Sequence, residues 1–135
     1  MNRIVQPKGW ARPKGYSNGV VAKGPTLFIA GQVGWDPTSE APKFPAGFAP
    51  QFEQALSNVL AVLSEAGGRP EHLVRLTVYV TSKQDYLSSL KACGATWKKL
   101  MGKSYPAMAL VQVAGLVEEG AVVEIEGTAV LPEGT

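Results

Sequence analysis

The segment Leu73–Thr81 alternates apolar residues with Arg, Thr and Tyr, and this alternation limits the folds that are open to the chain. A period of two residues is typical of a β-strand whose two faces meet different surroundings. Helical patterns flank this strand, one from Pro50 to Gly67 and one from about Asp85, which can cap its first turn, to Met101. Because each helix has one apolar stripe to bury, we expect both helices to cover the same face of a sheet.

Strand-like segments at both ends of the chain complete the predicted sheet. Residues 19–33 contain two β-rich segments separated by Lys23, Gly24 and Pro25, which favour a turn and so predict a hairpin. Residues 105–130 are predicted to form a second apolar hairpin. The predicted element order is ββαβαββ. It describes an α+β two-layer sandwich with two helices on one face of a mixed sheet.

Glycine and proline mark the predicted irregular segments. Residues 1–15 carry several of both and predict an N-terminal arm, and residues 35–50 carry four prolines and predict a long exposed loop. With 135 residues and 45% hydrophobic composition, the chain is long enough for one domain with its own core, spanning residues 1–135.

Charge and residue counts exclude several function classes. The net charge is +2 without a block of like charges, so no nucleic-acid partner is expected. No stretch approaches the ~18 apolar residues of a membrane span and no secretory signal is recognisable, so we expect a cytoplasmic protein. The single cysteine, Cys93, lies on a helical apolar stripe and is expected to be a buried, inert thiol. Metal-ligand and cofactor motifs are missing from the sequence, so neither a metal nor a cofactor is expected.

The sheet face turned away from the helices is expected to be partly apolar. We predict that it carries, beside Thr77, Glu124 and Glu126, the side chains of Tyr79, Met108, Leu110, Val122 and Val130. Such a face is too apolar to be left wet in a small monomer. The sequence therefore predicts a homo-oligomer that buries it.

Glu124 and Tyr16 carry side chains that are suited to a catalytic or ligand-binding site. Glu124 lies between Val123 and Ile125, and a carboxylate in such surroundings can act as a general acid or base. Alternatively, Glu124 and Glu126 are solvated or paired with lysines. Tyr16 precedes the first predicted hairpin and is either an edge aromatic or a hydroxyl donor to a ligand.

Five sequence motifs occur in an order that carries more information than any of them alone. They are GYSNGVV, LFIAGQVG, RLTVYVTS, YPAM and VVEIEGTAV. From Tyr16 to Leu131 the chain resembles the reactive-intermediate deaminase (Rid) family, also called L-PSP endoribonuclease-like proteins. The resemblance implies a chorismate-mutase-like fold, a homotrimer and a small-molecule site between subunits. It also implies hydrolysis of imines and enamines, such as 2-aminoacrylate, to a keto acid and ammonia.

The resemblance also assigns roles to individual residues. Glu124 matches the glutamate that handles the attacking water, and Tyr16 matches the tyrosine that faces the ligand. The backbone of Gly31 is expected to line the pocket, and the main-chain carbonyl of Leu110 to hold the water. Met108 stands where the family has an arginine that binds the substrate carboxylate. A ribonuclease activity, suggested by the family's older name, is the least expected because the chain has one histidine and no basic stripe with aromatics.

Met108 makes 2-aminoacrylate an unexpected substrate. A thioether offers neither charge nor donor, and losing a charged hydrogen bond costs ~1.5–3 kcal/mol, which is at least tenfold in affinity. Arg12, Lys14 or Lys91 could supply another cation; alternatively, Met108 marks a pocket for an aromatic or ring-derived enamine. Two functions follow: a deaminase acting on some other small enamine or imine, or a non-catalytic trimer that binds a metabolite or protects proteins. Ala30, in place of the family's serine, fits either function.

Overall fold

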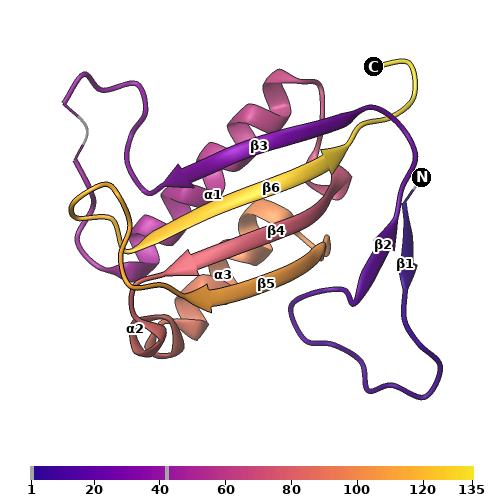
Figure 1. Cartoon of the computed structure of the whole chain (residues 1–135), viewed down its shortest axis with the longest axis horizontal. Coiled ribbons are helices and arrows are strands. Elements are labelled where there is room, and N and C mark those ends of the chain that lie inside the picture. The colour runs from indigo at the N-terminus through magenta and orange to yellow at the C-terminus, as the bar shows by residue number, and fades with distance from the viewer. Residues whose placement is uncertain (1, 42) are drawn as a thin grey trace.

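A mixed four-stranded sheet forms one layer of the protein. The computed structural model describes residues 2–41 and 43–135; Met1 and Pro42, which belong to the predicted arm and loop, lie outside the described residues. The strands follow the spatial order β3 (Thr26–Val33), β6 (Val123–Val130), β4 (Leu73–Val80) and β5 (Ala107–Gln112). The pair β4 and β5 is parallel, whereas β6 runs antiparallel to both β3 and β4 (Figure 1).

The helices form the second layer, behind the sheet in Figure 1. They are α1 (Phe48–Glu65), α2 (Lys83–Ser88) and α3 (Leu90–Met101), and a 3₁₀ turn, η1 (Pro70–His72), leads into β4. This arrangement confirms the predicted α+β two-layer architecture. The second predicted helix is divided at Ser89 into α2 and α3, and its cap is Ser82 rather than Asp85, since the Asp85 amide donates to Ser82 Oγ at 3.1 Å.

Helix α1 carries the largest share of the core. Phe52, Leu56, Val59 and Leu63 recur at helical spacing and are buried against the sheet. Burying each of them contributes ~1.5–3 kcal/mol relative to exposure. The helix ends at a glycine turn in which Gly67, at φ 85°, adopts the left-handed conformation that a side chain would disfavour.

The closing hairpin predicted for residues 105–130 is wrong. Strand β5 pairs with β4, and β6 inserts between β3 and β4, so β5 and β6 are not neighbours. The physical reason is burial: every second residue of β6, from Val123 to Ala129, is buried on the helix side, which requires a central position in the sheet. Strand β5 is more exposed and occupies the edge.

The first predicted hairpin is also wrong. Strand β2 (Gly19–Val21) pairs with β1 (Arg3–Val5) in a separate two-stranded ribbon rather than with β3. The predicted arm therefore contains a strand. A strand of three residues is too short to produce a recognisable periodic pattern in the sequence. Long-range bonds stabilise it: Asn18 donates to Gln6 at 2.6 Å, and the Ser17 amide donates to the carbonyl of Pro106 at 3.0 Å, beside β5.

Strand register decides which face each site residue occupies. Met108 and Leu110 pair with Leu76 and Val78 and share their helix-side face, so their predicted position on the open face is wrong. The parallel pairing with β4, which the sequence pattern left undefined, sets this register. Val122, which was also predicted on the open face, packs against the core instead.

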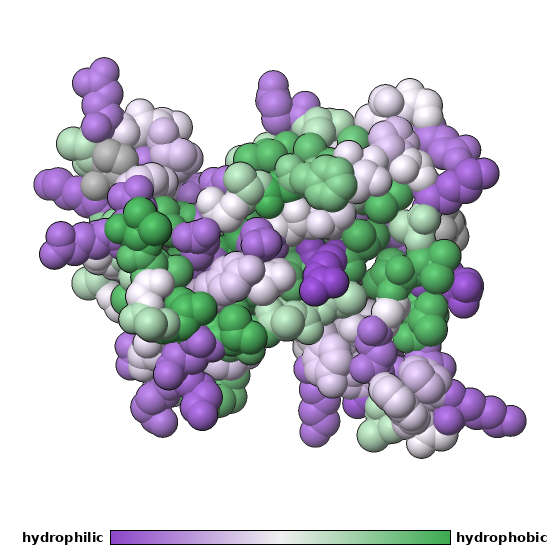
Figure 2. Space-filling view, viewed as in Figure 1, coloured by the Kyte–Doolittle hydropathy of each residue, from purple (hydrophilic) through white to green (hydrophobic). Residues whose placement is uncertain are grey.

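The open face carries the other predicted residues. Tyr79, Thr77, Glu124, Glu126 and Val130 lie on it as predicted. They are joined by Val111 and by Phe28, which is 79% exposed. Figure 2 shows this side of the molecule, with apolar patches interrupted by hydrophilic residues. Within the described residues, none of the helices has the length and apolarity needed to cross a membrane.

Candidate functional site

Gly31 and Glu124 are in direct contact across strands β3 and β6. The pairing of these strands shifts register between Ile29 and Gln32, which places Gly31 in the irregular part of β3. A Cβ at Gly31 would lie 2.9 Å from Cδ of Glu124 and closer still to its Oε2. Glycine therefore leaves room for the carboxylate to lie against the backbone of β3. The structure brings together the residues predicted to handle water and to line the pocket.

Glu124 and Glu126 have different surroundings on the open face. Glu124 is opposite Tyr79 in the register, yet the Tyr79 hydroxyl donates to Glu126 Oε1 at 2.9 Å. This hydrogen bond raises the pKa of Tyr79 because it stabilises the protonated phenol. Among residues 2–41 and 43–135, the ion pairs involve neither carboxylate, so pairing with lysine does not account for them.

Met108 and Leu110 line an apolar cavity of about 540 Å³ on the helix side of β5. We call it the Met108 cavity. Its other walls come from α1, α2, α3, β4, the arm and the segment before β5, and its aromatic lining consists of Phe52, Tyr86, Trp97, Tyr105 and Tyr16. Trp97 and Tyr105 stack with ring centroids 6.0 Å apart, and Trp97 Nε1 donates to the carbonyl of Ser104 at 3.2 Å. The stacked pair has a fixed orientation at the cavity wall.

Burial perturbs two groups that line the Met108 cavity. It raises the pKa of Tyr86, and it raises the pKa of the Cys93 thiol to about 11. Cys93 is also 6% exposed. Since a thiol with such a pKa is almost wholly protonated near neutral pH, the expectation of an inert cysteine agrees with its surroundings.

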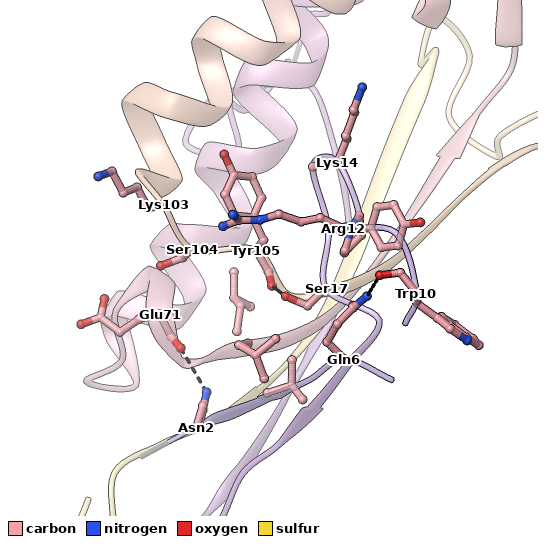
Figure 3. Close-up of a pocket in the computed structure, with 16 residues that line it drawn as sticks. Asn2, Gln6, Trp10, Arg12, Lys14, Ser17, Glu71, Lys103, Ser104 and Tyr105 are labelled. Atoms are coloured by element: carbon pink, nitrogen blue, oxygen red, sulfur yellow. Dashed lines mark hydrogen bonds between the residues drawn. The ribbon is translucent and has the colours of Figure 1, made fainter. Parts of the chain in front are cut away.

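A second cavity, which we call the arm groove, adjoins the first one. It has a volume of about 1000 Å³ and lies between the arm, the start of β4 and the segment that follows α3. Figure 3 shows Arg12, Lys14 and Lys103 around it. The arm is fastened here by hydrogen bonds, since Asn2 donates to the carbonyl of Glu71 at 3.1 Å (Figure 3).

The two cavities share part of their lining. Lys14, Gly15, Tyr16 and Tyr105 line both of them. Arg12 lines the arm groove but is outside the lining of the Met108 cavity, and Lys91 on α3 is outside the lining of both. Of the three predicted substitute cations, Lys14 is thus the one that lines the Met108 cavity.

The predicted site residues form two groups rather than one. Tyr16, Met108 and Leu110 line the cavity at β5, an edge of the sheet, whereas Gly31 and Glu124 lie near β3, the opposite edge. The sequence did not indicate that three aromatic residues of the predicted helical segments, Phe52, Tyr86 and Trp97, line this cavity. An aromatic residue on a helical apolar stripe does not by itself indicate a cavity, because such stripes ordinarily pack against a sheet.

The protein is thus an α+β two-layer sandwich with two adjoining cavities at the β5 edge of its sheet. The family described as Endoribonuclease L-PSP matches residues 10–131. A 2-iminobutanoate/2-iminopropanoate deaminase of Capra hircus is 36% identical over 105 residues, covering 78% of this chain and 72% of the relative. A RutC family protein of Synechocystis is 32% identical over 130 residues, covering 96% and 97%.

Solved structures agree with these relatives. The crystal structure of the Rid family protein YyfB from Yersinia pestis matches with a TM-score of 0.80 and 32% identity, covering 96% of this chain and 98% of that one. The chain therefore belongs to the L-PSP endoribonuclease family, which is the Rid family predicted from the sequence motifs.

Proposed function

We propose that this protein hydrolyses a small imine or enamine, with Glu124 as the residue that handles water. The contact between the Glu124 carboxylate and Gly31 is the observation that carries the proposal, because it holds a general acid or base at a sheet surface beside exposed backbone. Relatives named 2-iminobutanoate/2-iminopropanoate deaminase support this reaction class.

Glu124 alone can move the protons that this hydrolysis requires. Water adds to the imine carbon while Glu124 accepts a proton from it, and the C=N bond becomes the C–N bond of a carbinolamine. Glu124 returns this proton to the nitrogen, which completes the neutral carbinolamine. It then takes the proton of the carbinolamine hydroxyl and delivers it to the amino group, which leaves as ammonia while the hydroxyl oxygen becomes the carbonyl oxygen of the product. The step is balanced with water as the co-reactant and needs no cofactor.

We further propose that the site is completed by a second copy of the chain, as in the predicted homotrimer. Met108 and Glu124 lie on opposite faces and toward opposite edges of one sheet, so a single subunit holds half of the site at each edge. Apolar residues on the open face, Phe28 and Val111, favour burial of that face between subunits. The cytoplasmic location stays a prediction.

A Glu124→Gln variant tests the catalytic role. An imine generated in solution by an amino-acid oxidase is supplied, and the keto acid and ammonia are measured. We expect a loss of about 10²-fold or more in kcat/KM, the usual contribution of a general acid or base. Glu126→Gln is the matched control on the same strand face and should lose far less. Equal turnover by wild type and Glu124→Gln would rule the role out.

Met108 favours an imine other than 2-aminoacrylate, because it brings no positive charge to the carboxylate. A Met108→Arg variant should therefore gain activity toward 2-aminoacrylate. An unchanged rate in a folded Met108→Arg protein would contradict this interpretation.

The apolar walls of the Met108 cavity also favour a second candidate, a non-catalytic trimer that binds a metabolite or protects proteins. Ligands that stabilise the protein in a thermal-shift screen without being turned over would support it. Glu124-dependent hydrolysis would exclude it.

A further inference from the structure

The Met108 cavity and the residues at its mouth point to a particular ligand class. We propose that Lys14 binds the carboxylate of an imino acid whose large apolar or aromatic side chain fills the Met108 cavity. This builds on the function proposed above and names the substrate class for the same site.

Cavity size is the first argument. Its volume of about 540 Å³ falls among pockets of ~300–1,000 Å³ that enclose drug-sized ligands. An imino acid with a short side chain would leave most of this space empty. Stacked Trp97 and Tyr105 offer a flat aromatic wall, against which a ring or a branched chain packs favourably.

Gly94, on the same helix as Trp97, supports the same ligand class. A glycine inside a helix costs roughly 1 kcal/mol relative to alanine, a cost that close packing can offset. Close packing does not explain Gly94, because nothing lies within 4 Å of where its Cβ would be, and Gly94 lines the cavity. The missing side chain enlarges the cavity.

Charge is the second argument. Lys14 is the one charged residue in the lining of the Met108 cavity among the described residues, and no carboxylate accompanies it there. A ligand that combines an apolar body with one negative group is therefore complementary to this cavity. Met108 contributes a flexible thioether that adapts to apolar shapes.

Backbone geometry presents Lys14 and Tyr16 to the same space. Gly15 between them has φ 82°, in the left-handed region that glycine adopts without strain. Both neighbours line the Met108 cavity as well as the arm groove. Lys14 is thus an exposed residue at the junction of the two cavities, where its flexible side chain can reach the anionic end of a ligand.

A binding experiment tests this pairing without requiring catalysis. The probes are phenylpropionate, its neutral amide phenylpropionamide, and propionate, each titrated calorimetrically into wild-type protein. We expect phenylpropionate to bind at least tenfold more tightly than either of the other two, since it alone has both the ring and the charge. Equal affinity for acid and amide, or no measurable binding of phenylpropionate, would overturn the proposal.

Charge variants test whether the preference for the acid over the amide depends on Lys14. Lys14→Met should make the acid and the amide bind equally, and Lys14→Arg should keep the preference for the acid. Lys91→Met, which removes the same charge from a residue outside both cavities, is the matched control and should bind like wild type. A Lys14→Met protein that keeps the tenfold preference would contradict the assignment.

A cavity variant tests the side-chain preference. Gly94→Leu adds a side chain where the structure has open space, so it should fold while losing phenylpropionate affinity by about tenfold or more. Unchanged affinity would overturn the location of the apolar group.

Turnover measurements separate this proposal from the proposed function. Lys14-dependent binding without hydrolysis would leave the ligand class standing and reject the deaminase. Glu124-dependent hydrolysis with no effect of Lys14→Met on KM would reject the ligand class and leave the deaminase standing.

Discussion

Replacing Gly31 with alanine should remove activity while leaving the fold almost intact. The added methyl group would approach Cδ of Glu124 to 2.9 Å and Oε2 more closely still. The backbone of β3 is held by pairing with β6, whereas the end of a glutamate side chain is free to rotate. The carboxylate is therefore the group that moves, by about 1 Å if normal contact is to be restored.

The expected magnitudes differ for stability and for catalysis. An off-rotamer side chain costs ~0.5–1.5 kcal/mol, which lowers the melting temperature of a domain of this size by roughly 2–6 °C. A displacement of about 1 Å at a catalytic group can reduce the rate by ~10²-fold, or about 2.7 kcal/mol of transition-state free energy. Activity should thus fall far more than stability.

The assay compares Gly31→Ala with two further variants. Gly115→Ala places the same methyl group where nothing lies within 4 Å and should behave like wild type. Combining Gly31→Ala with Glu124→Asp shortens the acid by one methylene and should restore part of the lost kcat/KM for the imine. Full activity in Gly31→Ala alone would refute the idea that Gly31 positions the Glu124 carboxylate.

Three other predictions concern assembly, the thiol and acid stability. Phe28→Asp should lower the molecular mass of the oligomer measured by light scattering, because Phe28 is 79% exposed on the open face. The control Val117→Asp, at a loop residue that is 98% exposed, should leave this mass unchanged. Modification of Cys93 by iodoacetamide in the native protein should be slow at pH 7 and accelerate as the pH rises toward about 11; fast reaction at pH 7 would contradict its burial. Hydrogen bonds from Lys99 and Thr96 lower the pKa of Glu53, so its stabilisation is present above about pH 4.5 and lost as the pH falls through the folded-state pKa. In urea titrations Glu53→Gln should thus cost about 0.5 kcal/mol at pH 7 and nothing near pH 2, and an equal cost at both would refute it.

Local patterns were sufficient for α1, for β4 and for the family. Helix α1 follows from the spacing of Phe52, Leu56, Val59 and Leu63, and β4 from its strict alternation, because both patterns record one apolar surface facing one core. The order of motifs from Tyr16 to Leu131 indicated the Rid family, to which the chain belongs. Gly31 and Glu124 were predicted as site residues, and the fold brings them into contact.

Strand partners depended on the tertiary structure. Strands β5 and β6 are neighbours in the sequence and suggested a hairpin, yet β6 lies at the centre of the sheet, where α1 packs against it and its helix-side residues are buried. The parallel pairing of β5 with β4 turned Met108 toward the helices, away from Glu124. A single chain therefore holds Met108 and Glu124 on opposite faces of its sheet, and the spacing of these residues in the sequence could not predict this separation.

The sequence by itself thus determined which residues are candidates for catalysis and ligand binding, because residue type and local period are properties of short segments. Only the tertiary structure decided on which face and near which edge of the sheet these residues lie, since register and strand order depend on burial summed over the whole sheet. Of Arg12, Lys14 and Lys91, only Lys14 lines the Met108 cavity among the described residues, and no periodic pattern in the sequence reveals this.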